Sequence, residues 1–158
     1  MTKDKFEYVG CHNVECLFAY AYLWAWGFCP IQEYNNHLDK MFLKAPDDEV
    51  LLELEESSSD YKKTFARLKR YFDYETNSFD SVKFGKVLFN GLEDAYKTDM
   101  FNIAEFGKRC YDIWKLLPNF LSEDQPFWTL SYADDPLSWG DEEQSRALFE
   151  AVFCFFKE

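Results

Sequence analysis

The sequence predicts an all-α fold, either a bundle or a stack of helical hairpins, formed by about seven helices. Apolar residues recur at helical spacing in almost every segment. Prolines and polar capping residues separate those segments at helix-like intervals. One composition runs through all 158 residues without a repeat or a low-complexity linker. We therefore expect a single domain over residues 1–158.

The first helices are predicted from apolar content and prolines. Residues 13–28 carry apolar side chains on all faces, which is typical of a central helix. Pro30 suits the first position of a second helix, which Pro46 ends, and the two helices should form an antiparallel hairpin. A short third helix is expected within 47–56, after an aspartate cap.

The next three helices are predicted over 60–74, 80–97 and 102–117. The first of these places its apolar residues on one face: Tyr61, Phe65, Leu68 and Phe72. Asn102, with a glutamate three residues later, resembles a capping box, and Pro118 ends the helix that follows. A last helix begins near Asp141 and runs to the chain end.

Residues 118–140 show no regular period, so we expect one irregular segment there. A short strand over Phe127 to Tyr132 is the alternative. Such a long loop in a compact domain tends to have a function.

The net charge of -12, from 29 acidic and 17 basic side chains, repels the phosphates of nucleic acids and anionic lipid headgroups. We therefore expect neither a nucleic-acid nor a membrane partner, and plain solubility is the alternative explanation of the charge. The five cysteines are odd in number and lie mostly in apolar runs: Cys11, Cys16, Cys29, Cys110 and Cys154. We expect them to be buried free thiols. Such thiols, and an N-terminus without the apolar run of a secretory signal, predict a cytoplasmic protein.

Few residues suggest catalysis or metal binding. Cys11, His12, Glu15 and Cys16 are possible zinc ligands by type, but their spacing matches no familiar motif. With His12 and His37 as the only histidines, a nucleophilic triad is disfavoured. We expect no cofactor and no enzyme, although carboxylate chemistry stays open because 29 acids always provide some suitable pair. Whether Cys11, His12 and Cys16 bind metal is left open.

Acidic residues gather in two blocks without a base, seven in 47–60 and seven in 116–145. The second block also contains large aromatic residues. Aromatic anchors rimmed by carboxylates suit a basic protein partner, whereas the alternative is a solvated helix face and a polar loop. The predicted partner-binding residues are Trp128, Tyr132, Asp134, Asp135, Trp139, Asp141 and Glu142.

This layout resembles the small acidic helical immunity proteins that bacteria encode beside polymorphic or contact-dependent toxins. The resemblance lies in size, acidity, the opening NVECLFAYAYLWAWGFCP and the run FWTLSYADDPLSWGDEE before the last helix. It implies an inhibitor that occludes a basic toxin, such as a nuclease, with an acidic, aromatic-rich surface. The alternatives are a nucleic-acid mimic, or an enzyme with carboxylate-based chemistry. Nothing in the sequence indicates an oligomeric state.

Overall fold

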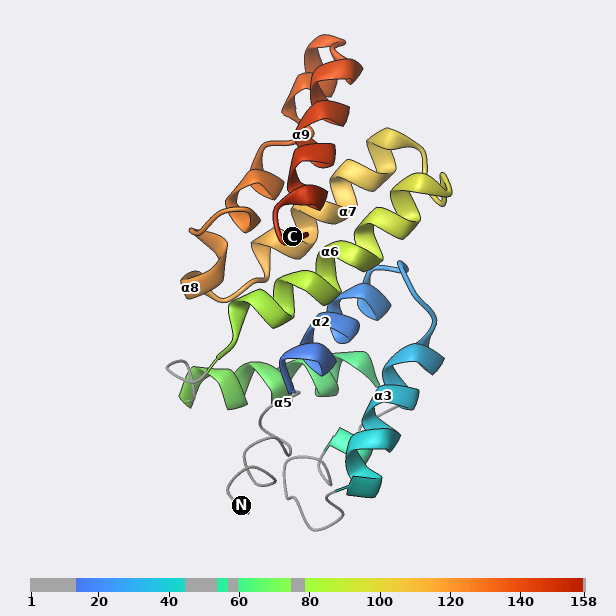
Figure 1. Cartoon of the computed structure of the whole chain (residues 1–158), viewed down its shortest axis with the longest axis vertical. Coiled ribbons are helices and arrows are strands. Elements are labelled where there is room, and N and C mark those ends of the chain that lie inside the picture. Colours follow the sequence, from blue (N-terminus) through green and yellow to red (C-terminus); the bar gives the residue numbers. More distant parts are fainter. Residues whose placement is uncertain (1–13, 45–53, 57–59, 75–78, 158) are drawn as a thin grey trace. The chain divides into compact units, whose positions relative to one another are not determined.

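The computed structural model describes residues 14–44, 54–56, 60–74 and 79–157 (Figure 1). Every regular element in these ranges is a helix and none is a strand, which confirms the all-α prediction. Internal contacts divide the chain into two compact units, Met1–Val87 and Leu88–Glu158. The boundary falls within one helix, and each unit is described separately. The single domain expected from the sequence stays a prediction.

The first unit contains α2 (Val14–Ala25), α3 (Ile31–Lys44), α5 (Tyr61–Tyr74) and the beginning of α6 (Ser81–Lys97). Helix α2 packs against both α3 and α5, as expected for a central helix. Its Phe18 ring lies 5.9 Å from Phe65 of α5 and 5.5 Å from Phe84 of α6, measured between centroids. Buried rings of this size stabilise the packing of the three helices. Most of the predicted third helix lies outside the described residues, although 54–56 are helical.

Helix α2 ends three residues earlier than the sequence pattern predicts. Gly27 has a φ of +80°, a left-handed conformation that glycine adopts without strain. The N–H groups of Gly27 and Phe28 donate to the carbonyls of Trp24 and Leu23, at 3.1 and 2.7 Å. These bonds satisfy free carbonyls at the helix end, so Gly27 ends the helix before Pro30 is reached.

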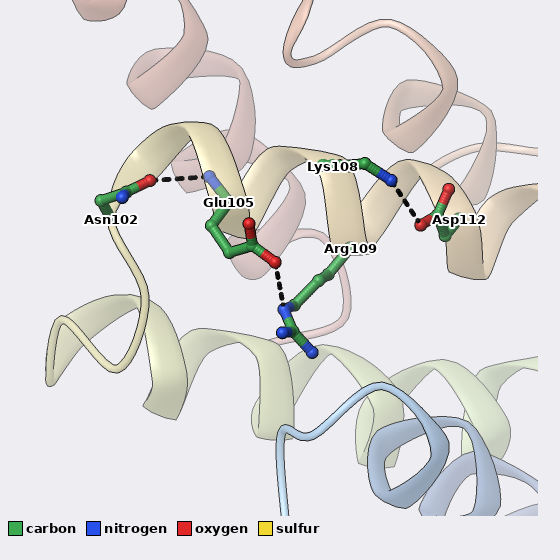
Figure 2. Close-up of polar contacts among 5 residues, drawn as sticks. All are labelled: Asn102, Glu105, Lys108, Arg109 and Asp112. Atoms are coloured by element: carbon green, nitrogen blue, oxygen red, sulfur yellow. Dashed lines mark hydrogen bonds and ion pairs between the residues drawn. The ribbon is translucent and has the colours of Figure 1, made fainter.

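The second unit contains the rest of α6, α7 (Ile103–Lys115), α8 (Asn119–Ser122), α9 (Glu142–Cys154) and two 3-10 helices, η3 (Phe127–Ser131) and η4 (Asp135–Trp139). Phe106 of α7 meets Phe149 of α9 edge-to-face at 5.0 Å in the core. Helix α7 begins at Asn102, whose Oδ1 accepts from the Glu105 N–H at 2.8 Å, as Figure 2 shows. Asn102 therefore caps α7 as predicted, whereas the Glu105 carboxylate, which would form the other half of a capping box, bonds Arg109 Nε at 2.8 Å.

The segment 118–140 consists of short helical turns, so the alternative of a strand over Phe127 to Tyr132 is wrong. Its backbone bonds are local: the N–H groups of Tyr132 and Ala133 both donate to the Thr129 carbonyl, at 3.1 and 2.9 Å. A 3-10 helix of five residues is too short to produce a visible period in the sequence, which explains why the pattern reads as irregular.

Candidate protein-binding surface

Residues 123–143 are here called the acidic segment, and its part from Trp128 to Asp134 lies along α7. The Trp128 ring contacts the Trp114 ring near the end of α7, at 5.9 Å between centroids. The Asp134 side chain lies on Gly107, near the beginning of the same helix. Seven helical residues rise about 10 Å. The segment therefore runs antiparallel to α7, and Trp128 and Asp134 are separated along its axis rather than gathered at one point.

Trp128 and Trp114 form a partly exposed ring pair. Trp128 is 42% exposed, and the two ring planes meet at 78°. Trp114 Nε1 donates to the Ser122 carbonyl at 2.9 Å, and the Trp128 N–H donates to the Asp124 carbonyl at 2.8 Å. The turn that carries the exposed residues Glu123 and Asp124 is thus hydrogen-bonded through its backbone to both tryptophans.

Trp139, at the end of η4, is 64% exposed. The next residue but one, Asp141, caps α9 by accepting from the Gln144 N–H at 3.0 Å. The Asp141 N–H in turn donates to the Pro136 carbonyl at 2.9 Å. These two bonds hold the turn that follows Trp139, and they give Asp141 a structural role besides its charge.

Asp134 and Asp135 differ in surroundings although they are neighbours. Asp135 is exposed, whereas Asp134 is half-buried against α7. Burial, together with the charges of Asp135 and Asp112, raises the pKa of Asp134. Asp134 is therefore a packing residue as well as an acid.

The remaining predicted residues are Tyr132 and Glu142. The Tyr132 hydroxyl lies 3.5 Å from Thr129 Oγ1, and its ring is half-buried. Exposed Glu142 forms an ion pair with Arg146 at 2.7 Å. The two residues are one helical turn apart, and an exposed pair of this kind adds little to the stability of the fold. Of the seven predicted residues, the structure exposes Trp128, Asp135, Trp139 and Glu142.

The acidic segment contains most of the unpaired charge of its unit. Residues 88–158 hold 14 acidic and 6 basic side chains. Five of the bases meet a carboxylate: Lys97 and Lys157 at Glu93, Lys108 at Asp112, Arg109 at Glu105 and Arg146 at Glu142. Figure 2 shows the two pairs on α7. The sixth base, Lys115, lies 5.5 Å above the Tyr111 ring. Within the described residues, six carboxylates of the segment therefore have no basic partner: Glu123, Asp124, Asp134, Asp135, Asp141 and Glu143.

Trp114 is not among the predicted surface residues, because it recurs at helical spacing with the apolar residues of its helix. In the structure Trp114 is half-buried, and its other neighbour is the Tyr111 ring at 5.8 Å. The available signal was chemical: an indole combines an apolar body with one N–H donor, which suits the edge of a core.

The possible metal ligands at the N-terminus are only partly described, since Cys11 and His12 lie outside the described residues. Glu15 is buried, and its Oε2 accepts from the Asp80 N–H at 2.9 Å, at the start of α6. In the part of the chain that the structure describes, no group of three or more His, Cys, Asp or Glu side chains could hold a metal ion.

The described cysteines are free, but they are less buried than expected: Cys110 is buried, Cys16 and Cys29 are half-buried and Cys154 is exposed. Burial raises the pKa of the Cys29 thiol to about 12, with a further contribution from Glu33. A thiol with such a pKa is a poor nucleophile at neutral pH.

No protein-family model, curated protein or solved structure matches this chain. None of the described helices has the length and apolar character needed to cross a bilayer.

Proposed function

We propose that this chain is a binding protein of the immunity type, which neutralises a basic toxin by covering it with the acidic segment. The observation that carries the proposal is the distribution of charge. Five of the six bases of residues 88–158 bond a carboxylate, and of these carboxylates Glu142 alone belongs to the segment, while the other six carboxylates of the segment have no basic partner among the described residues. These carboxylates accompany two exposed indoles, Trp128 and Trp139.

Charge and indoles would have separate tasks in such a complex. Unpaired carboxylates attract a cationic surface over several ångströms and raise the association rate. Trp128 and Trp139 provide large apolar area at the centre of a contact, where binding energy concentrates. A nucleic-acid mimic has less support, because the indoles interrupt any regular row of carboxylates. The bacterial toxin as partner rests on the resemblance of the sequence.

The proposal is tested by affinity capture with three versions of the protein, each at low and high salt. One variant combines Asp135→Lys with Glu143→Lys, two exposed acids of the segment. Its control combines Glu33→Lys with Asp94→Lys, exposed acids outside the segment, and changes the net charge equally. Asp134 is avoided because it also packs on Gly107.

We expect the wild type and the control to retain a basic protein at low salt and to release it at high salt, while the segment variant captures little. Equal capture by all three proteins would contradict the proposal. If no protein is captured in a salt-sensitive way, solubility alone would explain the acidic residues.

A further inference from the structure

We propose that the Trp114–Trp128 ring pair, together with Glu123 and Asp124, binds an arginine side chain of the basic partner. This inference rests on the proposed function and specifies the chemistry of one contact within it.

The ring pair leaves part of the Trp128 indole accessible to a flat cation. The two ring planes meet at 78°, so the rings pack edge-to-face. The ring that contributes its edge to this contact is not covered on either face by the other ring. Trp128 is 42% exposed, which leaves part of the pair accessible to a ligand. A guanidinium group stacks on an indole face through the negative charge of the π system, and tryptophan is the best of the aromatic residues for this contact.

The turn bonded to both tryptophans carries two exposed residues of the complementary charge, Glu123 and Asp124. Glu123 follows Ser122, whose carbonyl accepts from Trp114 Nε1, and the carbonyl of Asp124 accepts from the Trp128 N–H. Glu123 therefore directly follows a residue that is hydrogen-bonded to one tryptophan, and Asp124 is itself hydrogen-bonded through its backbone to the other. Neither has a basic partner among the described residues. An arginine can stack on a ring and bond a carboxylate at once, because its donors lie in the plane of the guanidinium.

In the second unit, Leu88–Glu158, two arginines each combine a contact with an aromatic ring and a bond to a carboxylate. The Arg109 guanidinium carbon lies 4.2 Å from the Phe101 ring centroid, while its Nε bonds Glu105 at 2.8 Å. Arg146 lies 5.6 Å from the Tyr96 ring centroid and bonds Glu142 at 2.7 Å. In both cases a ring and a carboxylate hold one arginine. The Trp114–Trp128 pair offers the ring and the carboxylates without the arginine, so we infer that the partner supplies it.

The test follows the five indole N–H signals of the ¹⁵N-labelled protein by NMR during titration with a short arginine peptide. A citrulline peptide of the same length, which has the same shape without the charge, is the control ligand, and a lysine peptide tests the preference for guanidinium. We expect the arginine peptide to shift the Trp114 and Trp128 signals most, the lysine peptide to bind more weakly and the citrulline peptide to have no effect. Shifts confined to Trp139, or equal shifts with citrulline, would overturn the inference.

Variants then separate the ring from the charge. Trp128→Leu retains an apolar side chain without a π face and should weaken binding of the arginine peptide about threefold. Glu123→Gln with Asp124→Asn should weaken it at least as much, whereas the matched change Phe155→Leu, at an exposed aromatic position outside the acidic segment, should leave it unchanged. Wild-type affinity of the Trp128→Leu protein for the peptide would refute the arginine site. If capture of the partner still depends on Asp135 and Glu143, the proposed function survives that result.

Discussion

The Asp134 side chain lies so close to Gly107 of α7 that a Cβ added at Gly107 would be 2.6 Å from the Asp134 Cβ. No relaxed structure accommodates two carbons at that distance, and a Cβ has little freedom to move because it is bonded to the backbone. Gly107 therefore permits Asp134 of the acidic segment to lie directly on α7, and this contact helps to position Asp134 and its neighbour Asp135.

We predict that Gly107→Ala lowers the free energy of unfolding by about 1–3 kcal/mol through overpacking. In an otherwise open helix the same change would be stabilising by about 0.5–1 kcal/mol. Urea unfolding monitored by circular dichroism measures the difference.

The control for this prediction is the same substitution in an Asp134→Gly background, where the opposing Cβ is absent. There Gly107→Ala should become neutral or stabilising. If the cost were equal in both backgrounds, the contact between Asp134 and Gly107 would not be its cause.

The helices that carry a long apolar period could be predicted from the sequence, whereas the short turns could not. Of the apolar residues that recur at helical spacing over 102–117, Phe106, Cys110, Ile113 and Leu117 are buried, whereas Ile103 and Trp114 are half-buried. In η3 and η4 only five residues each are helical, and their conformation depends on packing against α7 and α9. Propensity over so few residues does not determine the backbone.

The candidate surface was predictable in composition but not in arrangement. Pairs one helical turn apart, such as Glu105 with Arg109, can be read directly from the sequence. The pair of Lys157 with Glu93 joins residues 64 positions apart and depends on the fold. The exposure of Trp128 depends in the same way on its contact with Trp114.

Asp141 should contribute to stability through its cap on α9. Replacing it with Ala removes the acceptor for the Gln144 N–H and should lower the stability by about 1 kcal/mol. Asp141→Ser retains a capping oxygen without the charge, so thermal unfolding of this variant should resemble that of the wild type. A Ser variant as unstable as the Ala variant would show that charge, rather than the cap, is what matters.

The indole N–H of Trp114 should stabilise the turn that carries Glu123. Trp114→Phe keeps a ring but leaves the Ser122 carbonyl without its 2.9 Å bond, and should lower the free energy of unfolding by about 1 kcal/mol. Trp139→Phe, at an exposed position, should change it by less than about 0.5 kcal/mol. Similar losses in the two variants would argue against a specific role of the Trp114 hydrogen bond.

Glu15 should make stability depend on pH. Burial raises its pKa above the ordinary value of 4.5, although the Asp80 N–H and Lys83 act in the opposite direction. The native state then holds its proton to higher pH than the unfolded state, so the Glu15 contribution to stability is present below 4.5 and is lost as pH rises through the native pKa.

Glu15→Gln keeps an oxygen for the Asp80 N–H and removes the titration. We expect the stability of this variant relative to the wild type to increase as the pH rises above 4.5. Chemical unfolding at a series of pH values measures this difference. A difference that stays constant, or that decreases with rising pH, would contradict the assignment.

Attraction of a basic partner by the acidic segment can be measured by association kinetics. The rate constant for binding of the captured partner is measured against ionic strength for the wild type, Asp135→Lys with Glu143→Lys, and Glu33→Lys with Asp94→Lys. We expect the rate constant to decrease steeply with salt for the wild type and the control, and to be lower and less salt-dependent for the segment variant. Identical rates and salt dependence in all three proteins would contradict it.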